Sequence, residues 1–335
     1  MLGAAAPSPS PCPLVGMDPD TDRSTWKIVL AFAIIYLVWG STFLAIRVGV
    51  HDVPPFLLAA LRFLAAGILL YGWMRARGEP VPSGREWRSA FVLAIFIFVV
   101  DYGFVFWAER RVPSGVTAVM MATIPVFMVL SEIVVLGTQR LTLRLALALL
   151  IGLGGVAVLV SRALDLSGAP IDPLGAVALL FAAMGWAVGS ALTRKLPLPA
   201  SKFMSSGVQM LSGGVLLLLT AAALGEFQRF HPAAVSRGAW IALVYLIVAG
   251  SLVAYSAYVW LIHRVSLTKV GTYAYVNPVV AVMLGYFFAG EEVGARTIVG
   301  TLCVLVSVVM ITTAPRATPA PKAPARERAK VALEA

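Results

Sequence analysis

Ten apolar stretches, each long enough to cross a lipid bilayer, dominate this chain of 335 residues. A membrane-spanning helix needs about 20 apolar residues to cover a hydrocarbon core of roughly 30 Å. The stretches lack the alternation of apolar and polar residues that is typical of strands, so we expect helices. The expected spans are 28–46, 56–74, 89–108, 114–135, 142–160, 173–192, 203–224, 239–260, 268–289 and 297–313.

Composition excludes a soluble protein, because 60% of the residues are hydrophobic and only 13% are charged. Soluble domains have about 45–50% apolar and about 25% charged residues. The net charge of +10 does not indicate a nucleic-acid partner, since Lys and Arg lie between the apolar stretches rather than on one face. Cys12 and Cys303 form neither a metal-binding pair nor a disulfide framework. The expected surroundings are therefore a lipid bilayer.

The two halves of the chain share residues at fixed offsets. An offset of 153 aligns Trp107, Arg111, Pro125 and Gly137 with Trp260, Arg264, Pro278 and Gly290. An offset of 147 aligns Trp39 with Trp186, Arg47 with Arg194 and Gly67 with Gly214. A tandem duplication explains these matches most simply, and five helices per copy make the copies enter the membrane in opposite senses. The predicted fold is an all-α membrane protein whose ten transmembrane helices form two inverted five-helix repeats.

The repeats set the expected domain boundaries. We expect a disordered tail at 1–25, repeats at 26–161 and 173–314, and a basic disordered tail at 315–335. Residues 1–25 lack the apolar segment of a signal peptide, and either Met1 or Met17 is compatible with the true start. With the N-terminus inside, 18 Lys and Arg residues fall on the inner side and 7 on the outer side, which predicts that both termini are cytoplasmic.

Pro125 and Pro278 lie near the centres of the fourth and ninth expected spans. A central proline removes one backbone hydrogen bond and bends the helix. Because the two prolines occupy matched positions in the repeats, we favour a role as hinges around a central cavity. The alternative is that they are packing kinks without a role in transport. Asn277 adds an amide where its repeat partner Ile124 is apolar, as an asymmetric substrate would require.

Arg62, Asp101 and Glu132 are charged residues inside the expected spans, where insertion at the bilayer centre costs about 2.5–3.5 kcal/mol. Arg62 and Asp101 lie at a similar depth, roughly 10 Å from the same face. We hypothesise an ion pair between them near the outer mouth of the cavity, with separate roles as the alternative. Arg62 would attract a substrate carboxylate or hold the outer gate. Glu132 is expected to snorkel to the inner interface, and Asp101 or Glu132 are the candidates for carrying a proton.

Aromatic residues inside the spans indicate a cavity that is partly apolar and partly wet, because buried Tyr and Trp need hydrogen-bond partners. A core or lipid-facing position is the alternative for each. The predicted substrate-binding residues are Trp39, Arg62, Tyr102, Trp186, Tyr273 and Asn277. The predicted gating or proton-coupling residues are Asp101, Glu132, Pro125 and Pro278.

Motifs of enzyme chemistry are absent from the sequence. It has no HExxH or GxSxG, its three histidines lie in loops or at helix ends, and the glycines of 152–155 have no lysine after them. We therefore expect no enzymatic activity, no metal and no cofactor.

Several short motifs, all in register with the ten spans, resemble the EamA-type members of the drug/metabolite transporter superfamily. They are Trp39–Phe43 with Arg47, Leu61–Phe63 with Ala65–Gly67, Val112–Gly115 leading to Pro125, Trp186–Ser190, Tyr275–Pro278, and Gly290–Glu291. The resemblance covers about 28–313. It departs in the first repeat, where the Gly-Glu that family members often show is Gly137–Thr138.

The resemblance implies two five-helix repeats, a central cavity and alternating access in the bacterial inner membrane, commonly with export of amino acids, metabolites or drugs. The expected partners are a small-molecule substrate and the bilayer, in a monomer or homodimer, with no nucleic acid. An importer or a metabolite exchanger is the alternative. A phosphate exchanger would need several cationic residues deep inside the spans, and Arg62 is the only one away from the span ends. A membrane-embedded enzyme or a structural partner protein is a further alternative, without a visible site.

Overall fold

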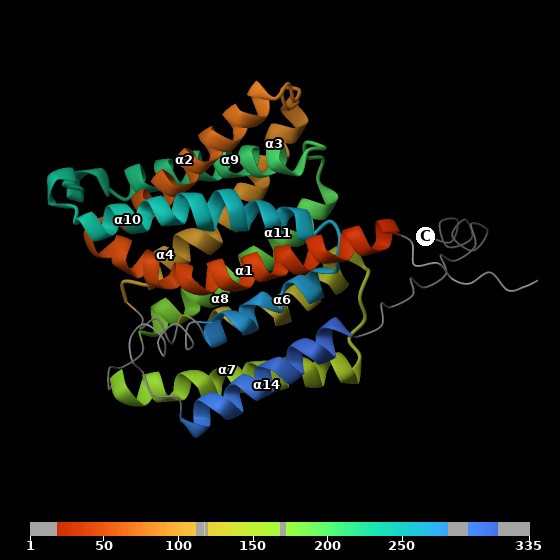
Figure 1. Ribbon diagram of the computed structural model, residues 1–335. Helices are drawn as coiled ribbons and strands as arrows, with labels where there is room; N and C mark the ends of the chain where they lie inside the picture. Colours follow the sequence, from red (N-terminus) through yellow and green to blue (C-terminus); the bar gives the residue numbers. More distant parts are fainter. Residues whose placement is uncertain (1–18, 112–116, 118–119, 168–171, 281–293, 314–335) are drawn as a thin grey trace, which may run out of the picture.

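The computed structural model describes residues 19–111, 117, 120–167, 172–280 and 294–313, and all regular structure in that part is helical (Figure 1). Six helices there are long and apolar enough to cross a membrane. They are Thr25–Asp52, Pro55–Ala76, Gly84–Ala108, Pro173–Lys195, Lys202–Ala223 and Arg237–Leu261. Three shorter apolar helices cover Ile124–Leu136, Leu143–Val158 and Ile298–Thr312. The all-α membrane fold is confirmed, but the described residues do not establish the count of ten.

The elements of the first half follow one another through short connections. They are α1 (Pro19–Asp52), α2 (Pro55–Ala76), a continuous span of α3 (Gly84–Ala94), η1 (Ile95–Gly103) and α4 (Phe104–Ala108), then α6 (Ile124–Ser131), η2 (Glu132–Leu136) and α7 (Leu143–Ser167). The second half has α8 (Pro173–Lys195), α9 (Lys202–Ala223), η3 (Phe227–Arg229), η4 (Pro232–Ala234), a continuous span of α10 (Arg237–Tyr245), η5 (Leu246–Tyr255) and α11 (Ser256–Leu261), then α12 (Leu267–Val270) and α14 (Ala295–Thr312). The segments η1, η2 and η5 are π-helical, whereas η3 and η4 are single 3-10 turns.

Side-chain caps start several of these helices. Ser83 accepts from the backbone of Glu86, whose carboxylate accepts from the Ser83 backbone in return, which makes a capping box for α3. The side chain of Asp172 accepts from Leu174 N at the start of α8. Serines at the N-caps of α9, α10 and α12 do the same. These polar loop residues therefore fix where the helices begin.

The N-terminal boundary differs from the expectation. We expected disorder over 1–25, but α1 already begins at Pro19. Proline is favoured in the first turn of a helix, so Pro19 is a suitable first residue for α1.

Equivalent helices of the two halves pack in a reciprocal way. The α-carbon of Gly67 in α2 lies so close to Leu211 that a methyl group there would meet Leu211 N at 2.7 Å. In α9, a methyl group at Gly214 would meet Leu64 N at the same 2.7 Å. Adding 147 to Gly67 gives Gly214, and adding 147 to Leu64 gives Leu211, so the two contacts are equivalent. A two-fold relation between α2 and α9 requires this equivalence. Small residues at such crossings let helices approach closely in lipid.

The remaining pairings repeat this relation. α7 packs along α14, α1 packs against α10 and η5, and α8 packs against η1 and α4 (Figure 1). Each half also places an arginine over a tryptophan one turn earlier: Arg111 lies 4.3 Å from the ring centroid of Trp107, and Arg264 lies 4.6 Å from that of Trp260. These two arginine–tryptophan pairs therefore have the same arrangement in the two halves.

Contacts between helix ends show the directions of the helices. The end of α1 meets the start of α10, where Asp52 accepts from Ser236 N at 2.9 Å. The end of the α3–α4 span meets the start of α8, where Arg111 and Asp172 lie 3.6 Å apart. Because α1 and the α3–α4 span run the same way through their hairpin with α2, α8 runs opposite to α1. The two halves are inverted relative to each other.

The two prolines differ in their distance from the nearest turn. The helix before α6 is interrupted by a turn at 122–123, and Pro125 lies in the first turn after it. In the second half the turn lies at 271–272, and Pro278 falls inside the helical stretch 273–280. The role of both prolines as hinges stays a prediction.

Some expectations fall outside the described residues. These are the tails at 1–18 and 314–335, the motif residues 112–116, the second part of the ninth span at 281–289, and Gly290–Glu291.

Candidate functional site

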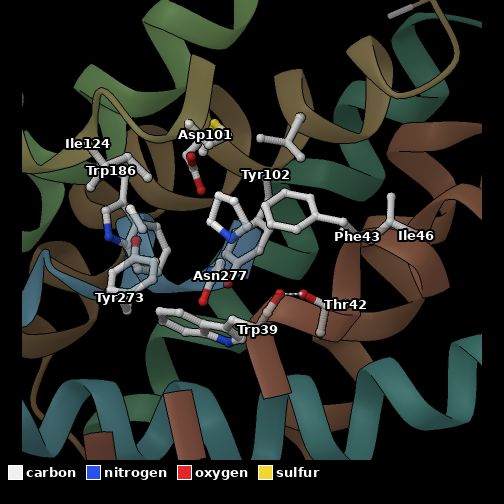
Figure 2. A pocket seen from close by; sticks show the side chains of 14 residues that line it. Trp39, Thr42, Phe43, Ile46, Asp101, Tyr102, Ile124, Trp186, Tyr273 and Asn277 are labelled. Carbon is white, nitrogen blue, oxygen red and sulfur yellow. Dashed lines mark hydrogen bonds between the residues drawn. The ribbon is translucent and has the colours of Figure 1, made fainter. Parts of the chain in front are cut away.

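A cavity lies between helices of both halves (Figure 2). About 60 Å³ of it is accessible to the centre of a water molecule. Its described lining comes from α1, η1, α4, the segment around α6, α8 and the stretch 273–280. The lining residues are Trp39, Thr42, Phe43, Ile46, Asp101, Tyr102, Val105, Met121, Ile124, Trp186, Tyr273, Ala274, Asn277 and Pro278.

Aromatic rings form much of the cavity wall. Trp39 contacts Trp186 edge to face, with ring centroids 5.3 Å apart, and Tyr273 similarly, at 4.9 Å. Tyr102 contacts Trp186 at 5.7 Å, and Tyr258 packs behind Trp39 and Trp186 at 5.2 and 4.8 Å. We call these five residues the aromatic cluster. Such edge-on contacts are favourable beyond the area that they bury, so the cluster is a rigid wall.

Hydrogen bonds hold the cluster in place. Trp39 Nε1 donates to Gly250 O in η5 at 3.3 Å, and the Tyr258 hydroxyl pairs with Ser190 Oγ at 2.5 Å. A π-helical turn widens the backbone and is frequent at functional sites. Here η5 presents the carbonyl that orients Trp39, and η1 carries Asp101 and Tyr102 to the cavity.

Asp101 is the only charged residue among the described residues that line the cavity. It is 3% exposed, and its Oδ1 has no hydrogen-bond partner in the described part of the chain. Figure 2 shows the carboxylate pointing toward the space between the rings. A buried carboxylate oxygen without a hydrogen-bond partner is costly, so this oxygen is free to accept a donor group from a ligand.

Arg62 does not line the cavity, and it does not form the expected ion pair with Asp101. Its Nε donates to Ser251 Oγ at 2.8 Å, and its guanidinium lies over the rings of Phe63 and Tyr102 at 4.6 and 5.1 Å. No ion pair joins Arg62 to Asp101 among the described residues. Arg62 and Asp101 lie at equal depth in the membrane. The rotation of α2, however, points Arg62 toward Ser251 in η5, and the rings of Phe63 and Tyr102 lie against its guanidinium.

Asn277 lies at the cavity wall with its amide held by backbone groups. In the orientation that satisfies its hydrogen bonds, its nitrogen donates to Tyr273 O at 3.0 Å and to Tyr36 O at 3.3 Å. Pro278 lines the cavity beside it, whereas Pro125 does not, and its neighbour Ile124 takes that place. The polar difference between Asn277 and Ile124 thus lies at the cavity itself.

Glu132 does not snorkel to an interface, since it is 2% exposed. Its carboxylate accepts from Leu267 N at 3.2 Å, from Thr268 N at 3.0 Å and from the Thr268 hydroxyl, which caps the start of α12. Its Oε1 also lies 3.5 Å from Arg194 Nη1 at the end of α8. These bonds join the end of the fourth helix to the second half, and we call them the Glu132 latch.

Sequence reasoning brought Trp39, Tyr102, Trp186, Tyr273 and Asn277 to one site, together with Asp101 and Pro278. Their roles in transport stay predictions. It missed Thr42, Phe43, Ile46, Val105, Met121 and Ala274, which are small or apolar residues that nothing in so apolar a chain distinguishes from the core. In the described part of the chain no cluster of three metal-ligating side chains occurs.

Comparisons with known proteins agree with this architecture. The model of the EamA-like transporter family matches residues 26–161 and 173–313. The chain is 36% identical over 280 residues to the "Uncharacterized inner membrane transporter YedA" of Escherichia coli, covering 83% of this chain and 88% of that protein. It is 30% identical over 276 residues to Protein PecM of Dickeya dadantii, covering 82% and 88%. A crystal structure that is 21% identical superposes with a TM-score of 0.67, covering 85% of this chain and 97% of its own, which supports the fold.

Proposed function

This chain belongs to the EamA-like transporter family and is a membrane transporter, and from that premise we propose that it works by alternating access around the aromatic cavity. In this proposal it is a secondary active transporter of the inner membrane that exports small amphipathic metabolites, amino acids or drugs. The name of the Escherichia coli relative supports the inner-membrane assignment.

The observation that carries the proposal is the position of the cavity between two inverted halves. Trp39 and Trp186 occupy equivalent positions in the two halves, contact each other edge to face, and both line the cavity. A site on such a pseudo-two-fold axis is exposed to either side when one half rocks against the other. The mixture of rings, one amide and one carboxylate suits small molecules that have an apolar body and a polar group.

The Glu132 latch supports an alternating mechanism. It joins η2 to the start of α12 and, through Arg194, to the end of α8. These segments lie at the end of the bundle that the Lys and Arg distribution assigns to the cytoplasm. In the proposal the latch closes the cytoplasmic side in this structure and breaks when that side opens, and both chain termini are cytoplasmic.

The residue roles follow from this geometry. Trp39, Tyr102, Trp186, Tyr273 and Asn277 contact the substrate, and Asp101 contacts its polar group or carries a coupling proton. Arg62 supports Tyr102 and η5 from behind the wall rather than binding substrate directly, because it is absent from the described lining and its Nε donates to Ser251 Oγ.

Flux into and out of proteoliposomes tests the proposal. Purified protein is reconstituted and offered a panel of amino acids, organic cations and neutral metabolites, with and without a pH gradient. We expect at least one compound to move faster than in empty liposomes, and this flux to be lost in Trp39→Ala but retained in Trp73→Ala, whose ring is 47% exposed on the outside of the bundle. Net movement in the direction of import would favour an importer. Exchange of one panel compound for another without net flux would favour an exchanger.

A further inference from the structure

Resting on the proposed transport function, we infer that the cavity selects small organic cations, with Asp101 and the faces of Trp39, Trp186 and Tyr273 as the binding groups. The ligand class is a monovalent ammonium whose charge is spread over a bulky, methylated head.

The carboxylate supplies the first argument. Asp101 is the only charge among the described lining residues, and its carboxylate points toward the cavity (Figure 2). Its Oδ1 has no hydrogen-bond partner in the described part of the chain. A buried carboxylate without a partner favours a ligand that brings a positive charge. An anionic ligand would add a second negative charge at the same place.

The rings supply the second argument, which is independent of the first. Trp39, Trp186 and Tyr273 pack on one another with ring centroids 4.9 to 6.5 Å apart, and each belongs to the cavity lining. The face of an aromatic ring carries negative potential, so a wall of several rings attracts a cation, and methylated ammonium groups are typical ligands of aromatic sites. The neutral lining from α1 and α4 then accommodates the rest of the ligand.

Arg62 does not cancel this preference. It interacts electrostatically with Asp101, but it is separated from the cavity, with its guanidinium over Phe63 and Tyr102 and its Nε bonded to Ser251. Because Arg62 is absent from the lining, a ligand carboxylate has no exposed cation to meet among the described lining residues. The geometry therefore favours a cation over a zwitterion.

The size of the space limits the ligand. About 60 Å³ is accessible to the centre of a water molecule, where a single water needs about 10–15 Å³. A head group of a few heavy atoms fits, and a drug-sized molecule needs the cavity to widen. Small methylated ammonium compounds are therefore the sharpest probes.

A charge series of one shape tests the inference. Choline, its neutral carbon analogue dimethylbutanol, the zwitterion betaine and the anion dimethylbutanoate all carry a head with three methyl groups. Binding of labelled choline to the purified protein in lipid nanodiscs is measured, with the other three as competitors. We expect choline to bind roughly tenfold or more tightly than each of the others. Dimethylbutanol that competes equally well, or betaine that competes better, would overturn the inference.

Variants locate the binding groups. Asp101→Asn keeps the shape of the side chain and should lower choline affinity roughly tenfold while leaving that of dimethylbutanol unchanged. Asp101→Glu should retain part of the affinity for choline. Glu79→Gln, in the loop between α2 and α3, is the matched control and should behave like the wild type. If Asp101→Asn binds choline as tightly as the wild type does, the cation binds elsewhere and the inference is wrong.

The outcome separates the inference from the proposed function. If choline does not bind but another panel compound crosses proteoliposomes, the cation selectivity is wrong and transport stands. If no panel compound crosses, the proposed function fails as well.

Discussion

The indole rings of Trp39 and Trp186 meet edge to face with centroids 5.3 Å apart, although 147 positions separate them along the chain. Each occupies the same place in its own half, and the same offset relates the contacts of Gly67 with Leu211 and of Gly214 with Leu64. A two-fold axis relates both sets of contacts. The cavity beside the tryptophans is thus built from equivalent surfaces that differ in polarity, with Asn277 where the other half has Ile124.

The crossing of α2 and α9 predicts a sharp difference between two glycines of one helix. Gly67→Ala would bring a methyl group to 2.7 Å from Leu211 N, whereas Gly72 has no atom within 4 Å of such a group. Overpacking of this kind costs about 1–3 kcal/mol, while alanine in an open helix position stabilises by roughly 0.8–1.0 kcal/mol. Thermal unfolding in detergent should show a lower midpoint for Gly67→Ala and an equal or higher one for Gly72→Ala. Equal unfolding midpoints for Gly67→Ala and Gly72→Ala would mean that α2 and α9 do not approach each other closely at Gly67.

The Glu132 latch predicts a local effect at the start of α12. Glu132→Ala removes the acceptor for Leu267 N and Thr268 N, and loss of such a cap costs about 0.5–2 kcal/mol. Hydrogen exchange of residues 266–272 should become faster, while the helix ends near Gly78 stay unchanged. Arg194→Ala breaks only the 3.5 Å ion pair and should have a smaller effect. An unchanged exchange rate in Glu132→Ala would show that the segment is held by other contacts.

Substitution of Arg62 is expected to lower the stability of the protein without changing its affinity for substrate. Arg62→Lys loses the Nε bond to Ser251 and the planar contact with Phe63 and Tyr102. A hydrogen bond to a charged group contributes about 1.5–3 kcal/mol, so the unfolding midpoint should fall. KM for a transported compound should remain near the wild-type value, with Ser251→Ala as the milder comparison. A raised KM at unchanged stability would instead place Arg62 in contact with substrate.

Glu109 is expected to make the free energy of unfolding depend on pH. It follows α4 outside the spans, is 4% exposed, and burial raises its pKa from 4.5 to about 8, an effect that the charge of Arg47 only partly offsets. The unfolded chain releases this proton at lower pH than the folded one, so this residue's contribution to stability falls as pH rises from about 4.5 to about 8.

The variant Glu109→Gln isolates this contribution. The difference in unfolding free energy between wild type and variant should change by up to ~1.4 kcal/mol per pH unit within that window and stay flat outside it. Denaturation followed at several pH values gives the difference. A constant difference across the window would mean that the carboxyl group keeps an ordinary pKa.

The sequence predicted the spans well where apolar length alone decides them. The boundaries of α2, α9 and the α10–α11 span differ by only a few residues from those expected, because Pro55, Ser201 and Ser236 mark the starts. The inverted relation of the halves also followed from residues at fixed offsets. Both features depend on local chemistry and on counting, which a single sequence contains.

The sequence could not show which face of a helix each polar residue takes. Arg62 and Asp101 lie at equal depth, yet only Asp101 lines the cavity, because the rotation of α2 depends on its crossing with α9. The backbone donors to Glu132 lie more than 130 positions away, on α12, and Arg194 lies 62 positions away. The π-helical turns of η1 and η5 leave no mark in an apolar segment, although they orient Asp101 and Trp39.

The central claim is that substrate passes through the cavity that Trp39 and Trp186 line. The most direct measurement is proteoliposome flux of one panel compound through four proteins: wild type, Trp39→Ala, Trp186→Ala and the outward-facing control Trp73→Ala. The account predicts that both cavity variants lose most of the flux to a similar degree while Trp73→Ala keeps it. Flux at the wild-type rate in Trp39→Ala and Trp186→Ala, with all four proteins folded and reconstituted equally, would contradict it.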